Sequence, residues 1–554
     1  MFRVFLSDVG AEAASGDSVV PFIVLGAYLA FLLVLGIVSY LKSHASEEDY
    51  YLAGRGQSWL VSALTIMATF FSSWALLGAP GKVYNDGLIF ALFALNVPFS
   101  GAMIVALGRG ICKLGKSNRY VTPGDMIADY YGGDAVRVLT ALTCVLYVVP
   151  YVVMQIQAGG VLFDALLDEP LVDWADNFTV GSILLACVTT VYIMIGGMRS
   201  VAWTDVFQGA LLVVGMLLGG YVVVTILGGL EGFSQKVAAL PDAWLTAPGA
   251  TGTWAPLFLC TVCTVGAAGT MVSPAQWMRY YAADSTRTLR RSAIIFSVVL
   301  TACFLFGVML VGIGAQVLYP CPVDTAGAPI FENGKLVINE AVGNADEILV
   351  LVLKEHLPVV LPGIGIWLAS IMVMAIAAGS MSTADSNLHA LSAVFTRDIY
   401  DRYLRKNAST SEKTWVGRVV IFVATAISLI LVIGARSQKA AGGGVLADSM
   451  QMIVDVGILA ISFSAQLVPV AVDMLWIRRG SRAGAAFGIA TGLIVTFVVW
   501  RAGAPFQGTS IGPVELKMMH GAWGIVANAL VFVIVSAMTK KDTKAQEFTR
   551  ELES

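Results

Sequence analysis

Four small residues lie on one predicted helix face, and the three that carry hydroxyl groups could take part in chemistry. Gly379, Ser382, Thr383 and Ser386 are spaced at i, i+3, i+4 and i+7, inside the long apolar segment 362–396. This spacing places them in one stripe along a helix. Such a stripe either lets two membrane helices pack closely or presents hydroxyl groups to a ligand. Both interpretations stand on the spacing alone, and we favour the second.

Asp385 lies on the flank of this stripe, roughly 110° around the helix from it. A carboxylate near the centre of a bilayer costs about 2.5–3.5 kcal/mol on insertion scales. Such a group usually faces a partner, a cavity or an ion. Asp385 therefore strengthens the functional interpretation of the stripe.

The composition predicts an all-α polytopic membrane protein. The chain is 57% hydrophobic and 13% charged, with a mean hydropathy of +0.79. The segments long enough to cross a membrane are 18–41, 58–82, 88–112, 133–163, 177–196, 201–229, 254–279, 288–318, 362–396, 415–435, 446–477, 482–501 and 519–539. These thirteen spans leave no polar stretch long enough for a soluble domain, so we predict one transmembrane domain over residues 1–554.

The placement of lysine and arginine predicts an outside N-terminus and an inside C-terminus. The basic residues that carry this prediction are Arg109, Lys113, Lys116, Arg119, Arg279, Arg287, Arg290, Arg291, Arg397, Arg402, Arg405, Lys406, Lys540, Lys541 and Lys544. Topology accounts for these basic loops, so we expect no nucleic-acid partner. We expect membrane lipid to surround the protein.

Two of the predicted spans are interrupted near their middle. Thr69, Ser72 and Ser73 interrupt the second, and Gly266–Thr270, followed by Ser273-Pro274, interrupts the seventh. A helix that unwinds at membrane depth frees carbonyl groups, and only a protein-lined or water-lined cavity tolerates them. Paired interruptions of this kind indicate a transporter binding site.

The interrupted spans each open a set of five. The sets are 58–229 and 254–478, flanked by an additional N-terminal helix at 17–41, C-terminal helices at 482–539 and a cytoplasmic tail at 540–554. Because each set has an odd number of helices, the two sets cross the membrane in opposite orientations, which allows an inverted repeat.

Polar residues recur in two other spans. Tyr151 and Gln155 share one face of the fourth span, next to Pro150. An interhelical hydrogen bond and a contact with a transported solute are equally consistent with that pair. Asp205 lies in the first turns of the sixth span, where it could cap the helix, complete a cation site or relay a proton.

Five stretches in order make the chain resemble the sodium:solute symporter family along nearly its whole length. They are Tyr51-Leu-Ala-Gly-Arg55, Ser73-Trp-Ala-Leu-Leu-Gly-Ala-Pro-Gly81, Gly196-Gly-Met-Arg-Ser-Val-Ala-Trp-Thr-Asp-Val-Phe-Gln208, Ala378-Gly-Ser-Met-Ser-Thr383 and Phe395-Thr-Arg-Asp-Ile-Tyr400. The resemblance implies a LeuT-like fold of two inverted five-helix repeats with additional helices around it.

The resemblance also implies a sodium site. Its ligands would be the carbonyls of Ala68, Phe71 and Gly379 and the hydroxyls of Ser382 and Thr383. Neutral hard oxygens suit a monovalent cation, whereas several carboxylates would favour a divalent one.

Some family members bind a second sodium with an aspartate at the position of Asp205 and hydroxyls near Ser386. Asp385 stands where those members tend to have a small hydroxyl residue. A tighter sodium site, a proton site and a salt bridge all fit this difference.

For the solute, the resemblance implies a site between the two helix breaks. The candidate contacts are Ser72, Ser73, Trp74, Tyr151, Gln155, Gln276 and Gln466. The stretch 146–155 resembles the monocarboxylate and pantothenate carriers more than the sugar carriers. The positive ends of half-helices suit a carboxylate, so we expect a small organic monoanion or an amino acid.

We therefore predict a sodium-coupled symporter of the cell membrane, working as a monomer and without a cofactor. A proton-coupled carrier is the near rival because of the two acids, Asp205 and Asp385, and a transporter-like membrane sensor is a more distant one. The sequence has no catalytic triad pattern or phosphate-binding loop, and its seven cysteines and four histidines are not spaced as metal ligands. We do not expect an enzyme.

Overall fold

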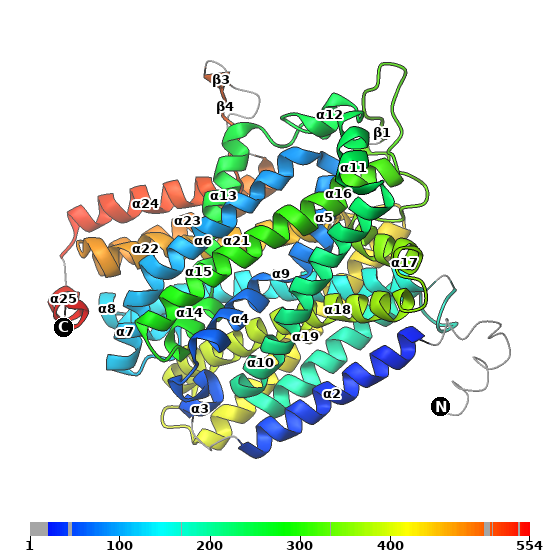
Figure 1. Ribbon diagram of the computed structural model, residues 1–554. Helices are drawn as coiled ribbons and strands as arrows, with labels where there is room; N and C mark the ends of the chain where they lie inside the picture. The colour runs from blue at the N-terminus through cyan, green and yellow to red at the C-terminus, as the bar shows by residue number, and fades with distance from the viewer. Residues whose placement is uncertain are drawn as a thin grey trace.

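A computed structural model describes residues 20–42, 47–167, 169–332, 334–503, 510–511, 514–540 and 543–553. It is a bundle of helices with two short hairpins at its margin (Figure 1). The α-helices are α2 (Val20–Lys42), α3 (Glu47–Leu52), α4 (Trp59–Phe70), α5 (Ala79–Asp86), α6 (Asn96–Met103), α7 (Arg109–Asn118), α8 (Pro123–Tyr131), α9 (Asp134–Leu166), α10 (Asn177–Ile226), α11 (Gly229–Ala238), α12 (Asp242–Leu245), α13 (Pro256–Met271), α14 (Pro274–Ala282), α15 (Thr286–Cys303), α16 (Leu310–Leu318), α17 (Ile348–Val360), α18 (Gly365–Val394), α19 (Thr410–Ala440), α20 (Val445–Ser449), α21 (Ile453–Ser464), α22 (Val468–Val472), α23 (Arg482–Ala502), α24 (His520–Met538) and α25 (Ala545–Glu553).

Short 3₁₀ and π-helical turns, labelled η, join or extend many of these helices. They are η2 (Ala53–Arg55), η3 (Trp74–Gly78), η4 (Leu88–Leu95), η5 (Ile104–Gly108), η6 (Phe304–Met309), η7 (Ala345–Glu347), η8 (Phe395–Leu404), η9 (Ala465–Leu467) and η10 (Asp473–Ile477). The antiparallel hairpins pair β1 (Phe331–Glu332) with β2 (Lys335–Leu336), and β3 (Ser510–Ile511) with β4 (Val514–Glu515).

In the described residues, ten helices are long and apolar enough to cross a membrane, or up to twelve if each of two bent pairs is one span. The chain is thus a multi-pass membrane protein. The predicted first span corresponds to α2, in which Ile23–Leu32 is the apolar stretch that is described. The predicted fifth and sixth spans correspond to Asn177–Met194 and Val201–Ile226 within α10. The count of thirteen and the orientation of the two termini stay predictions.

The two bent pairs lie where polar and small residues interrupt the predicted spans. The chain turns by 59° between α4 and the helix that begins at Trp74, and by 52° between α13 and α14. At the first break, Phe71 has a ψ of 84°, and the Ser72 amide donates to the Phe70 carbonyl instead of continuing the helix. At the second, Ser273 is extended and Pro274 starts the next helix, because proline has no amide hydrogen to give to the preceding turn.

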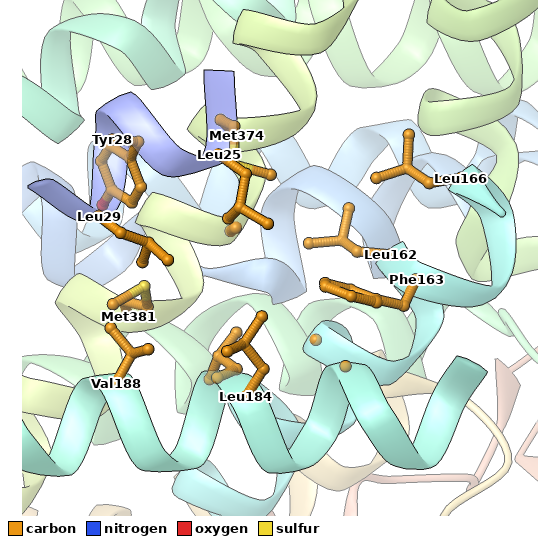
Figure 2. Close-up of a pocket in the computed structure, with 14 residues that line it drawn as sticks. Leu25, Tyr28, Leu29, Leu162, Phe163, Leu166, Leu184, Val188, Met374 and Met381 are labelled. Atoms are coloured by element: carbon orange, nitrogen blue, oxygen red, sulfur yellow. The ribbon is translucent and has the colours of Figure 1, made fainter. Parts of the chain in front are cut away.

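The helix α2 lies along one side of the bundle, while α23 and α24 lie on the opposite side (Figure 1). Figure 2 shows the seam between α2 and the bundle, a narrow apolar pocket of ≈ 30 Å³ bordered by α2, α9, α10 and α18. At one end of this pocket the Tyr28 hydroxyl accepts a hydrogen bond from Gln208 of α10 at 2.5 Å. One polar contact thus ties α2 to the helix that carries Asp205.

A loop between α16 and α18, residues 319–364, folds over one end of the bundle. Its turn η7 touches the first interrupted helix, since a Cβ on Gly81 of α5 would lie 2.5 Å from the Ala345 carbonyl oxygen. Asp346 then accepts a hydrogen bond at 3.0 Å from the amide of Ile453, the first residue of α21. Glycine at position 81 therefore allows the loop to bridge α5 and α21.

Asp346 makes this bridge sensitive to pH. Burial raises the pKa of Asp346 from 3.8 to about 7, so the folded protein holds a proton that the unfolded chain has released between those two values. The free energy of unfolding should then fall as the pH rises through this window, by at most about 1.4 kcal/mol per pH unit. We expect the thermal midpoint of the wild type to fall more between pH 5 and pH 8 than that of Asp346→Asn, which keeps an oxygen for the Ile453 amide.

Asp324→Asn is the matched control, because Asp324 is exposed in the same loop. It should leave the pH dependence of the wild type unchanged. An equal change in midpoint for the wild type and for Asp346→Asn would contradict the assignment.

Candidate functional site

The first helix break and α18 meet at a cluster of neutral oxygens. The Ser382 hydroxyl donates to the Ala68 carbonyl at 3.3 Å, and the Thr383 hydroxyl donates to the same carbonyl at 3.2 Å. The Ser382 hydroxyl also lies 3.1 Å from the Gly379 carbonyl. Four of the five predicted sodium ligands are therefore linked by these contacts.

The break explains why the Ala68 carbonyl is available. In an unbroken helix it would accept from the Ser72 amide, but that amide turns to Phe70 instead. Phe71, the fifth predicted ligand, is the residue that ends α4 at this break. All five residues are buried, so the freed oxygen needs a partner inside the protein: a protein donor, an ordered water or an ion.

Gly379 allows α18 to come this close. A Cβ at this position would lie 2.7 Å from Leu212 of α10 and 3.1 Å from Leu76 of η3. The stripe predicted from sequence thus combines two roles, because its glycine permits close packing and the hydroxyls of Ser382 and Thr383 reach across to α4.

Two of the three residues of the second predicted site, Asp205 and Ser386, contact a buried arginine. Asp205 of α10 pairs with Arg279 of α14 at 3.0 Å, and the same arginine nitrogen donates to the Ser386 hydroxyl at 2.5 Å. The remaining nitrogens of Arg279 donate to the carbonyls of Thr65 at 3.1 Å and Ala275 at 3.2 Å. Arg279 is 1% exposed, so a fixed positive charge lies between α4, α10, α14 and α18.

Asp385 faces a different set of partners. It accepts hydrogen bonds from the hydroxyl of Tyr192 and, at 3.2 Å, from that of Ser386. Its carboxylate is completely buried, and Asp205 is near enough to interact with it electrostatically. The second oxygen of Asp205, Oδ1, has no hydrogen-bond partner among the described residues. Two carboxylates therefore share the surroundings of one guanidinium group.

Arg279 was not predicted as part of any site, because it was counted among the basic residues at a cytoplasmic span end. A signal was present in the sequence. Apolar and aromatic residues continue after it through Tyr280, Tyr281 and Ala282, which is unusual for a residue that faces water.

Several predicted solute contacts come together at the first break. The Gln155 side chain of α9 accepts from the Ser73 amide at 3.3 Å and from the Ser73 hydroxyl at 2.8 Å. The Ser72 hydroxyl accepts from the Trp74 amide at 3.2 Å and interacts with Tyr151. All of these side chains are buried.

Trp74 closes this group on the side of the 319–364 loop. Its indole nitrogen donates to the Val454 carbonyl of α21 at 3.3 Å, and the ring packs on Gly457. Phe93 lies against the same ring, with a centroid distance of 4.7 Å. The break is thus covered by an aromatic side chain anchored to the second set of helices.

Two further predicted contacts lie apart from this group. Gln276 of α14 donates to the Ile66 carbonyl of α4 at 3.3 Å. This contact links the two interrupted spans at a point that precedes the break in α4. Gln466 of η9 donates to the Ser462 carbonyl at 3.0 Å and to Thr496 at 3.2 Å. The structure therefore brings Gln466 to the C-terminal helices and not to Ser72 and Ser73.

Comparisons with known proteins agree with this architecture. A model of the sodium:solute symporter family matches residues 50–492. The sodium/proline symporter of Escherichia coli is 26% identical over 534 residues, which cover 93% of each chain, and the sodium/pantothenate symporter of Haemophilus influenzae is 24% identical over 72% of this chain and 76% of its own. These relatives are transporters and not enzymes.

Solved structures resemble the chain in fold. The structure of a sodium-coupled sialic acid symporter in a substrate-bound outward-open state has a TM-score of 0.73 at 18% identity, covering 94% of this chain and 98% of that one. The nucleobase-cation-symport transporter Mhp1 in a closed conformation has a TM-score of 0.50 at 13% identity, covering 90% and 96%. The match over most of its length places the chain in the sodium:solute symporter family.

Proposed function

We propose that the protein is a sodium-coupled symporter that imports a small organic solute across the cell membrane by alternating access. The observation that carries the proposal is the contact of the Ser382 and Thr383 hydroxyls with the Ala68 carbonyl at the helix break. Sodium would bind there to these oxygens and to the carbonyls of Phe71 and Gly379. Sodium bound between α4 and α18 would hold the two sets of helices together in the loaded state.

The solute would bind beside the break, in contact with Ser72, Ser73, Trp74, Tyr151 and Gln155. These side chains offer hydroxyls, an amide and aromatic faces but no cation. That chemistry suits an amino acid or a small monocarboxylate better than a dianion. The relatives named above, whose names give proline and pantothenate as their solutes, support the same size class.

Asp205, Asp385 and Ser386 form a candidate second cation or proton site. The observation that favours a proton-coupled alternative is the burial of Asp385 against hydroxyl groups, with Arg279 already paired to Asp205. A bound proton would neutralise Asp385 without needing the additional oxygen ligands that a sodium ion takes.

The deciding experiment is uptake into proteoliposomes of labelled L-proline, pantothenate and lactate. We expect an inward sodium gradient to drive uptake of at least one of them, and an equal potassium gradient to drive none. Uptake that is unchanged without sodium and that follows an inward proton gradient would select the proton-coupled alternative. Uptake driven by the sodium gradient and uptake driven by the proton gradient are measured at the same membrane potential, because about 100 mV adds 2.3 kcal/mol for each charge moved.

A further inference from the structure

A short helix, α25, lies against the bundle beside α7 and α8 (Figure 1). It falls in the predicted cytoplasmic tail, and a polar segment joins it to α24, the last span. An isolated helix of nine residues is marginal in water, so contacts with the bundle hold α25 in place. Because its connection to α24 is polar, α25 can leave the bundle and return while the spans stay in position.

Two apolar side chains of α25 face the bundle. The Phe548 ring is 1% exposed and packs on Tyr130 of α8, with a centroid distance of 5.0 Å. One turn further on, Leu552 lies against α7, where a Cβ on Gly110 would be 3.6 Å from the leucine side chain. The Leu552 carbonyl also accepts a hydrogen bond from the Lys113 ammonium group of α7 at 3.0 Å. Phe548 is the buried residue of α25 and therefore its main apolar anchor.

Polar contacts hold both ends of α25. Immediately before the helix, the Lys544 amide donates to the Tyr130 carbonyl at 3.0 Å, and the Lys544 ammonium group lies 2.9 Å from Asp129. In the last turn, the Asn118 side chain of α7 donates to the Glu551 carboxylate at 2.7 Å. Exposed ion pairs contribute little to stability, so these contacts fix where α25 docks more than how tightly it docks.

The helix α25 also reaches the second predicted set of helices. The Thr549 hydroxyl accepts a hydrogen bond at 2.8 Å from Arg478, the residue that follows η10. Arg478 ends the predicted set 254–478, whereas α7 and α8 belong to the predicted set 58–229. A single helix outside the spans is thus attached to both sets.

The helix α7, on which α25 docks, also packs against α14 of the second interrupted span. A Cβ on Gly115 of α7 would overlap the ring of Tyr281. The Cys112 thiol of α7 lies 3.9 Å from the Ala283 carbonyl and is 1% exposed. The seam between α7 and α14 is therefore closed. Because α14 carries Arg279, separating these two helices would open the bundle toward the candidate site from the predicted cytoplasmic side.

We propose that α25 is an autoinhibitory clamp. Docked on α7, α8 and Arg478, it stabilises the conformation in which the seam between α7 and α14 is closed, and its release allows this side to open. Alternating access moves one set of helices against the other, and a helix attached to both sets opposes that movement. The proposal rests on the proposed transport function and adds a control on one of its two conformations.

The test follows α25 and the seam separately, in the full-length protein in nanodiscs. Trypsin cleavage after Arg550 reports release of α25. Alkylation of Cys112 by N-ethylmaleimide, measured by peptide mass spectrometry, reports opening of the seam. We expect Phe548→Ala to raise both rates by about tenfold, because burial of a phenylalanine ring is worth at least this factor. Cys303, which is buried in α15, should keep its alkylation rate, and this excludes a general loosening of the bundle.

A second variant leaves the sequence of α25 intact. Asn118→Ala removes the donor to Glu551 and should raise both rates by about threefold, the size of one lost hydrogen bond. The matched control is Gln546→Ala, at an exposed position of α25, and it should leave both rates unchanged. Circular dichroism and size-exclusion elution confirm that each variant is folded.

Faster cleavage after Arg550 with an unchanged alkylation rate at Cys112 would overturn the proposal, and so would an unchanged cleavage rate in Phe548→Ala. The proposed transport function would survive either result if the proteoliposome assay still showed sodium-driven uptake of a solute. The expected difference in alkylation without sodium-driven uptake would instead count against the transport function alone.

Discussion

Replacing Thr383 or Ser382 with alanine is expected to raise the sodium concentration for half-maximal uptake by about tenfold. Each substitution removes one neutral oxygen ligand and leaves the buried Ala68 carbonyl with one fewer partner. A lost hydrogen bond or ligand of this kind costs about 1–2 kcal/mol, and 1.4 kcal/mol is a factor of ten in an equilibrium constant. Uptake at saturating sodium should fall less, because the solute contacts remain.

The control uses another hydroxyl of α18. Ser380 is also completely buried, but its hydroxyl donates to the Ile376 carbonyl of its own helix at 3.1 Å. Ser380→Ala therefore removes the same atom without touching the break. Thr383→Ser keeps the oxygen and should restore most of the sodium affinity. If Ser380→Ala and Thr383→Ala shift the sodium dependence equally, the hydroxyl stripe acts in packing and not in ion binding.

The helix face on α18 and the break after α4 could be predicted from the sequence because both signals are local, whereas their role as a sodium site stays a prediction. A helix period places Gly379, Ser382 and Thr383 on one face, and polar residues in an apolar span indicate a break at Ser72. The five stretches that resemble the sodium:solute symporter family then relate this helix face to the break. How the two elements meet in space is visible only in the structure. The Ser72 amide turns away from the Ala68 carbonyl, which leaves that carbonyl available to α18.

Other contacts depend on which face of a helix meets which neighbour, and a single sequence does not contain that information. Gln466 lies in a polar, kinked span like the other candidates, yet its side chain bonds to Thr496 of α23. Lys82 and Asp455 form an ion pair, yet they are separated by more than three hundred residues and have no local signal that pairs them. Arg279 was assigned to a span end because charge counting uses distance along the chain and not burial.

Arg279→Met is expected to be the most damaging single substitution in the core. It leaves Asp205 as an uncompensated buried charge and removes the donors to Ser386 and to the Thr65 carbonyl. Breaking a buried ion pair by removing one partner typically costs about 3–5 kcal/mol. We expect a marked fall in the thermal midpoint of the purified protein, whereas Arg287→Met, at an exposed arginine, should leave it unchanged.

The double variant Arg279→Met with Asp205→Asn separates charge compensation from packing. If Arg279 serves mainly to neutralise Asp205, the double variant should recover a large part of the lost midpoint, and the two substitutions should be strongly non-additive. Additive losses would contradict that role.

A further variant, Arg279→Ala, tests the second cation site, because the arginine side chain already supplies positive charge to Asp205 and Ser386. Sodium should bind there measurably better in Arg279→Ala than in the wild type if Asp205 and Ser386 are competent ligands, and sodium binding that is equal in the two proteins would leave Ala68, Ser382 and Thr383 as the proposed site.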